Sequence, residues 1–171
     1  MSFFLPLLLA GALLAPTVSP NVSNDDKHPR SRRIVVDTAA QRQVAAELVA
    51  HAKRAAESGS MLEARAHLLT ANTMYREAGG LETSAAYSLV HIDYALDRYV
   101  EAGDLLTELA DQAMKDGDPT LAANASVDAA SLYSLGGRRI QVANTVNRLR
   151  ALIKDPRLSE ADRASLKKRL G

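Results

Sequence analysis

The apolar positions of residues 81–117 recur at helical intervals, in two runs separated by a short polar break. The first run places Ala85, Leu89, Ile92 and Leu96 at steps of four, three and four. The second run follows the break and holds Tyr99, Ala102, Leu105, Leu106, Leu109, Ala113 and Met114. Such steps put apolar side chains on one face of a helix. The stretch therefore predicts two amphipathic helices that pack antiparallel across a short connection.

Capping residues and glycine pairs divide the rest of the chain into further helices of the same kind. Thr38 with Gln41 is expected to cap a first helix that runs to about residue 57, before Gly59. Further helices are expected over residues 60–78, 119–135, 138–154 and 160–170, ended by Gly79-Gly80, Gly136-Gly137 and Pro156. The predicted fold class is all-α, with about three antiparallel hairpins followed by a C-terminal helix.

The helix pairs share a pattern of small and apolar residues at a spacing close to forty residues. Ala64, Ala102 and Val142 take the same place in successive second helices, 38 and 40 residues apart. A period in this range indicates stacked hairpins, because one hairpin alone cannot bury its apolar face.

The first hairpin resembles the tetratricopeptide repeat. The resemblance rests on Leu48, Ala52, Ala55, Gly59, Ala64, Leu68 and Ala71, and extends with weaker matches over residues 37–155. The spacing exceeds the family's usual period of about 34 residues, and Asp93 stands where an aromatic residue is usual. The resemblance implies a right-handed stack capped by residues 160–170, which binds proteins in a concave groove lined by the first helix of each pair.

Composition narrows the classes of function. With 171 residues, 47% of them hydrophobic, the chain is long enough to bury a core, and 4% aromatic residues predict a core of Ala, Leu and Val. The net charge of +1 argues against a nucleic-acid partner. The absence of cysteine excludes disulfides and thiolate metal sites. No catalytic signature is found, and no cofactor is expected. Asp93 and Asp97 are carboxylates at helical spacing and are expected to lie on a solvated face.

The first 36 residues of the chain differ from the rest. Residues 3–15 form an apolar run that is too short to span a bilayer and fits the core of a secretory signal, although no Lys or Arg precedes it. We expect a signal peptide over residues 1–19, a flexible polar spacer over 20–36 and the helical domain over 37–171. The expected location is periplasmic or secreted, without a stable membrane span in the mature chain. A buried or tethering segment, or a wrongly assigned start, stays open.

Candidate partner-binding residues lie on the first helices of the predicted pairs. Tyr87, His91 and Tyr94 share the face of their helix that is opposite the apolar stripe. In the groove that the resemblance implies, they would contact a protein or peptide partner, together with Lys53, Asn124, Val127 and Ser131. The alternative is that the tyrosines are buried against the second helix.

Two other functions stay open. His51 and His67 each follow a glutamate by four residues and lie eight residues from Gly59, so a hairpin would bring them level as weak candidates for a metal site. The simpler expectation for His51, which shares a stripe with Val44, is a partly buried, hydrogen-bonded side chain. The last helix could also dock on a second copy through Ala161, Ala164, Leu166 and Leu170, which would make the protein a self-associating structural module.

Overall fold

The computed structural model describes residues 37–170, which form seven helices without a strand among them. The helices are α1 (Thr38–Glu57), α2 (Met61–Glu77), α3 (Thr83–Ala95), α4 (Tyr99–Asp116), α5 (Pro119–Leu135), α6 (Arg139–Leu152) and α7 (Glu160–Leu170). The all-α prediction is confirmed. The predicted signal peptide and spacer, residues 1–36, lie outside the described part of the chain.

Side-chain caps begin four of the helices. The carboxylate of Asp37 accepts from the amides of Ala39 and Ala40 at 3.1 Å, so the predicted box of Thr38 with Gln41 is wrong by one residue. Ser60 precedes α2 as predicted, but its hydroxyl makes no cap bond. Glu82 caps α3, Asp118 caps α5 at 2.8 Å, and Ser159 caps α7 by accepting from the amide of Asp162 at 3.0 Å.

The same turn joins α1 to α2, α3 to α4, and α5 to α6. Its left-handed residue is Gly59 (φ 84°), Asp97 (φ 57°) and Gly137 (φ 69°) in turn, at a spacing of 38 and then 40 residues. In each turn the next amide donates to the carbonyl five residues earlier at 2.8 Å: Ser60 to Ala55, Arg98 to Asp93 and Arg138 to Tyr133. The three helix pairs therefore repeat one connection, at the spacing seen in the sequence, and the α4/α5 turn has it too, with Gly117 (φ 83°) and a 2.8 Å bond from Asp118 to Ala113.

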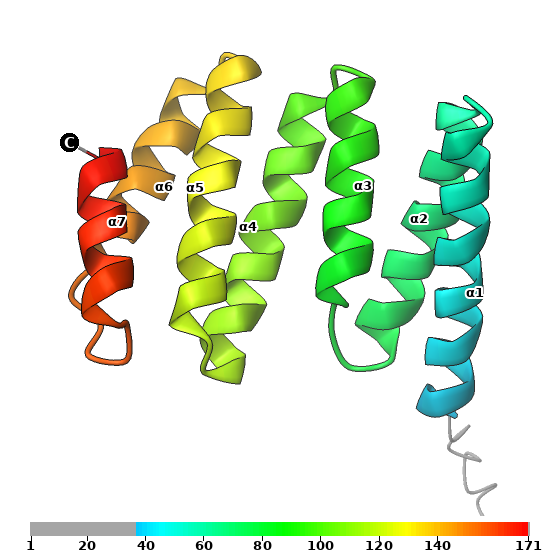
Figure 1. Ribbon diagram of the computed structural model, residues 1–171, viewed down its shortest axis with the longest axis horizontal. Helices are drawn as coiled ribbons and strands as arrows, with labels where there is room; N and C mark the ends of the chain where they lie inside the picture. The colour runs from blue at the N-terminus through cyan, green and yellow to red at the C-terminus, as the bar shows by residue number, and fades with distance from the viewer. Residues whose placement is uncertain (1–36, 171) are drawn as a thin grey trace, which may run out of the picture. The chain divides into compact units, whose positions relative to one another are not determined.

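Consecutive helices pack against one another, and side chains also link alternate helices. Among the even-numbered helices, the guanidinium of Arg76 on α2 donates two hydrogen bonds to Glu108 on α4, and Arg148 on α6 pairs with Asp111 on α4. Among the odd-numbered helices, Tyr87 on α3 donates to Asp128 on α5, and Thr120 on α5 donates to Asp162 on α7. The odd-numbered helices thus form one row and the even-numbered helices another (Figure 1).

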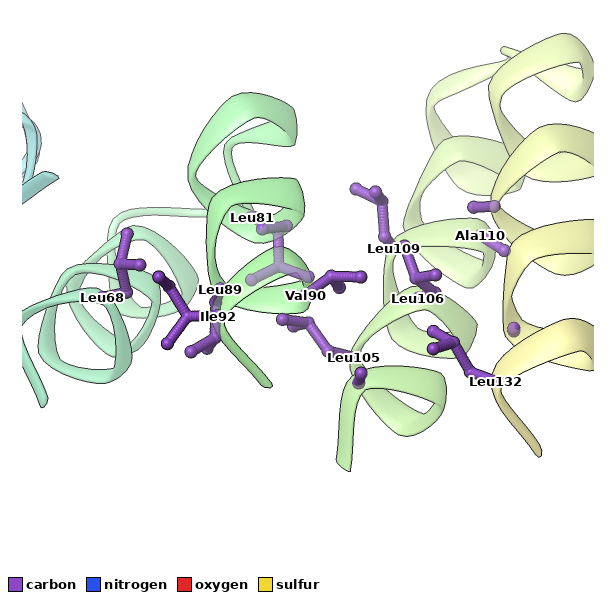
Figure 2. Close-up of a cluster of buried hydrophobic side chains, with 14 of the residues drawn as sticks. Leu68, Leu81, Leu89, Val90, Ile92, Leu105, Leu106, Leu109, Ala110 and Leu132 are labelled. Carbon is purple, nitrogen blue, oxygen red and sulfur yellow. The ribbon is translucent and has the colours of Figure 1, made fainter. Parts of the chain in front are cut away.

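The core consists of three clusters of small and branched side chains, which the partly buried Val49 and Leu121 join. The largest cluster begins at Ala52 on α1 and passes through Leu68, Leu89 and Leu106 to Leu132 on α5; Figure 2 shows most of it. Leu106 is fully buried at the middle of the chain. Half of the buried apolar residues are alanines, so neighbouring helix axes approach closely. The stripe predicted for α4 is confirmed at Ala102, Leu105, Leu106, Leu109 and Ala113.

α4 and α5 meet at Gly103, which lies against the ring of Tyr133. A Cβ atom at position 103 would lie 2.8 Å from Cε1 of that ring. The ring cannot easily move, because its hydroxyl donates to Asp104 at 2.7 Å and lies 3.1 Å from the hydroxyl of Thr107. Glycine at this helical position therefore allows a close approach of two helices.

Gly103→Ala is expected to lower the free energy of unfolding by about 1–3 kcal/mol, as measured by urea denaturation, because the added methyl group overpacks the contact with Tyr133. Replacing an exposed glycine in a helix by alanine would instead raise the free energy of unfolding by about 1 kcal/mol. As a control, Gly103→Ala introduced into a Tyr133→Ala background should be stabilising. Destabilisation of equal size in both backgrounds would contradict the proposed clash.

Asp93 on α3 is buried, with 2% of its side chain exposed, although its sequence pattern predicts a solvated carboxylate. Nε of Arg65 on α2 donates to its Oδ1 at 2.5 Å, and Nε of Arg98 lies 3.8 Å away. A buried carboxylate requires such partners because its desolvation is costly. The prediction for Asp93 was therefore wrong, and Arg65 explains why the charge is tolerated.

The large apolar residues of α7 pack against other helices of the same chain. Leu166 is 3% exposed and packs in a cluster with Ala123 and Leu149, while Leu170 packs at the edge of that cluster. Of the face predicted to dock on a second copy, only Ala161 and Ala164 are exposed. The expectation that Leu166 and Leu170 lie on an unpaired face was therefore wrong.

Candidate functional site

The row of α1, α3, α5 and α7 carries three hollows, and we call this surface the odd-helix face. The α1/α3 hollow has a volume of about 420 Å³ and a largely alanine wall. Its lining residues are Ala46, Val49, Ala50, Ala52, Lys53, Ala56, Leu68, Ser88, His91 and Ile92. The hollow forms because short alanine side chains on α1 leave space that a larger residue would fill.

The α3/α5 hollow lies beside it and has a volume of about 400 Å³. It is lined by Tyr87, Val90, His91, Tyr94, Leu106, Asp128, Ser131, Leu132 and Leu135. Because His91 lines both hollows, they form one continuous surface across α3. Ser131 and Leu135 in turn line a third hollow of about 480 Å³, which reaches Val127, Val146 and Arg169.

Six of the seven predicted partner-binding residues line these three hollows. Lys53, His91 and Ser131 each stand six residues before the left-handed residue of the following turn, so they occupy equivalent places on α1, α3 and α5. Asn124 is the exception among the seven, because it lines a separate small pocket between α5 and α7. The sequence did not single out Ser88, Asp128 or Leu135, whose positions depend on how the helices pack.

The two tyrosines of α3 have different environments. Tyr87 is half-buried, and its hydroxyl donates to Oδ2 of Asp128 on α5 at 3.3 Å. Burial first, and then the charge of Asp128, raises the pKa of Tyr87 to about 12, so the phenol is neutral at physiological pH. Tyr94 is 52% exposed, and its ring packs edge-on against Tyr99 at 5.5 Å between centroids. The alternative that both tyrosines are buried against α2 was wrong.

Among the predicted partner-binding residues of α3, Tyr94 and His91 are exposed. They face outward because the buried side of α3 is taken by Ala86, Leu89, Val90 and Ile92. Exposed aromatic side chains beside an apolar hollow supply contact area with few rotatable bonds. The odd-helix face thus combines apolar hollows with polar groups at their rims.

His51 and His67 are level across the first hairpin, with ring centroids 5.8 Å apart. Nε2 of His67 lies 3.8 Å from Oε1 of Glu63. His51 is exposed, so the expectation of a partly buried side chain was wrong, because the buried stripe of α1 runs through Ala45 and Ala52 instead. Within residues 37–170, no three His, Cys, Asp or Glu side chains come together in a group that could hold a metal ion.

No family model, curated protein or solved structure matches this chain. Among the described helices, none is both long and apolar enough to cross a membrane. The function must therefore be argued from the odd-helix face itself.

Proposed function

We propose that the helical region binds an apolar segment of a protein or peptide partner on the odd-helix face. The observation that carries this proposal is the continuity of the α1/α3 and α3/α5 hollows through His91, with Tyr94 exposed at the rim. Clefts lined mainly by apolar and aromatic side chains, with a few polar groups, are typical binding sites. The chain would then act as a scaffold or assembly factor rather than as an enzyme.

A tetratricopeptide-like stack is the arrangement that we propose for the helices. Three features support it: the identical turn in each of three helix pairs, the rows of odd- and even-numbered helices, and the repeated spacing of 38 and 40 residues. In a stack of this kind the first helix of each pair lines one face, which suits an extended or helical ligand lying across several repeats.

The chemistry of the hollows indicates what the partner presents. The alanines of α1 leave room for a large aliphatic or aromatic side chain, and the ring of Tyr94 offers a stacking surface. Residues 3–15 fit a secretory signal, so we propose that binding takes place outside the cytoplasm.

Tyr94→Ala is expected to weaken binding at least about tenfold, because truncating an exposed aromatic anchor commonly removes 2 kcal/mol or more. Peptides selected by display on the full chain from a random library serve as probes, and fluorescence anisotropy measures their affinity. The melting temperature should hardly change, since half of the Tyr94 side chain is exposed.

Leu69→Ala is the matched control, because Leu69 is a partly exposed large apolar residue on α2, outside the odd-helix face. It should leave peptide affinity unchanged. Selected peptides that bind equally well to the wild type and to the Tyr94→Ala and His91→Ala variants would contradict the proposed site, as would a library that yields no binder.

A further inference from the structure

The turn between α5 and α6 exposes large apolar side chains at its two ends. Residues 135–140, which we call the α5/α6 tip, begin with Leu135, 58% exposed, and end with Ile140, 76% exposed. Six large hydrophobic residues are exposed in the described part of the chain: Val44, Leu62, Leu69, Tyr94, Leu135 and Ile140. Four of them, Leu62, Tyr94, Leu135 and Ile140, lie within three residues of the turns α1/α2, α3/α4 and α5/α6, which gather at one end of the helices (Figure 1). Exposed apolar residues that gather in this way indicate an interaction surface.

Two arginines stand between the exposed apolar residues of the α5/α6 tip. Arg138 and Arg139 are both exposed, and neither guanidinium makes an ion pair or hydrogen bond with another side chain of residues 37–170. The equivalent arginine of the α3/α4 turn, Arg98, does have a partner, because Nη2 donates to Oε1 of Glu101 at 2.5 Å. At the position equivalent to Glu101, the α5/α6 tip has Gln141, which cannot neutralise a cation.

The neighbouring turn extends the patch with a tyrosine. Tyr94 and Leu135 line the same hollow, so they lie close together at the ends of α3 and α5. The α5/α6 tip also touches the start of α4, since a Cβ atom built on Gly136 would lie 2.9 Å from Cγ2 of Val100. The patch therefore joins tyrosine, leucine and isoleucine side chains to two exposed guanidinium groups.

We propose that the α5/α6 tip docks on the surface of an anionic lipid bilayer. Ile140 is 76% exposed at the start of α6, so it suits a soft surface that it can enter, whereas a folded partner would need a matching cavity. Isoleucine and leucine would enter the boundary between headgroups and acyl chains, with tyrosine at the level of the headgroups. Arg138 and Arg139 would meet lipid phosphates, where each cation near an anionic membrane adds to affinity. This peripheral contact needs no spanning helix, and it goes beyond the proposed peptide site through Arg138, Arg139 and Ile140, while sharing Tyr94 and Leu135 with it.

A dye at position 140 tests the contact directly. The chain has no cysteine, so Ile140→Cys in the full chain can be labelled at one site with an environment-sensitive fluorophore. Vesicles of phosphatidylcholine with roughly one third phosphatidylserine should shift its emission to the blue. Lys154→Cys, beyond the other end of α6, is the control and should not respond. An unchanged emission at position 140 would overturn the proposal and favour a protein partner for this tip.

Charge reversal gives a second measurement, by flotation of the full chain with the same vesicles. Arg138→Glu with Arg139→Glu should reduce the membrane partition coefficient at least about tenfold, and high salt should reduce that of the wild type. Arg150→Glu with Lys154→Glu makes the same change in net charge at the other end of α6, and should leave partitioning nearly unchanged. Because every variant carries residues 1–36, their contribution cancels. Equal losses in the two pairs would overturn a specific role for the tip.

Discussion

Leu106→Asp is expected to unfold residues 37–170 under conditions in which the wild type is folded. Leu106 is fully buried between α3, α4 and α5, in the middle of the largest cluster (Figure 2). A carboxylate there would have no partner, and burying an unpaired charge or reorganising the core around it costs more than about 4 kcal/mol. Loss of the far-ultraviolet circular-dichroism signal, or of a cooperative thermal transition, would measure the effect.

The control for this prediction is Leu62→Asp. Leu62 is 74% exposed in the first turn of α2, where a carboxylate is compatible with the helix dipole, so the same substitution should leave the fold intact. If Leu106→Asp melted at the wild-type temperature, the continuous core between the helices would be wrong.

Asp93→Ala is expected to lower the free energy of unfolding by about 2–4 kcal/mol. The substitution removes the acceptor of Arg65, whose side chain is only 19% exposed, and so leaves a poorly hydrated cation between α2 and α3. Urea denaturation measures this loss. Glu101→Ala is the matched control, because it breaks the exposed pair with Arg98 and should cost at most about 1 kcal/mol.

A double-mutant cycle separates the ion pair from the other contacts of Asp93. If Arg65→Ala and Asp93→Ala act through each other, their combined effect will be smaller than the sum of the single effects. Additive effects would show that the pair contributes little, and that the loss comes from the cavity left by the side chain.

The sequence predicted helices well and the direction of individual side chains less well. The stripe of α4 was found because three leucines recur with alanines at helical spacing, and because the helix ends at a glycine, Gly117. The inward face of α1 was misplaced because the prediction gave weight to Val44, which is 46% exposed, rather than to Ala45 and Ala52. In a core made of alanines, the largest apolar side chain of a helix is not a reliable sign of its buried side.

The sequence predicted which residues lie on the candidate surface, but it did not predict the contacts between those residues. Lys53, His91 and Ser131 were assigned to the groove that the resemblance to the tetratricopeptide repeat implies. The bond from Tyr87 to Asp128 joins residues 41 positions apart, and the burial of Asp93 depends on Arg65, 28 positions away. Pairings across that distance depend on how helices pack, and a periodic pattern carries no information about them.

The repetition of one turn at Gly59, Asp97 and Gly137 has a consequence for how the protein unfolds. Among residues 37–170, the α1–α2 hairpin packs on the other helices mainly where α2 meets α3, so it has a neighbouring pair on one flank only. Amide hydrogens of α1 should therefore exchange with solvent sooner than those of α4, and opening should start at the ends of the array and move inward. Stability in such a molecule is a local property, graded along the chain, so damage to an outer hairpin can leave the middle ones standing.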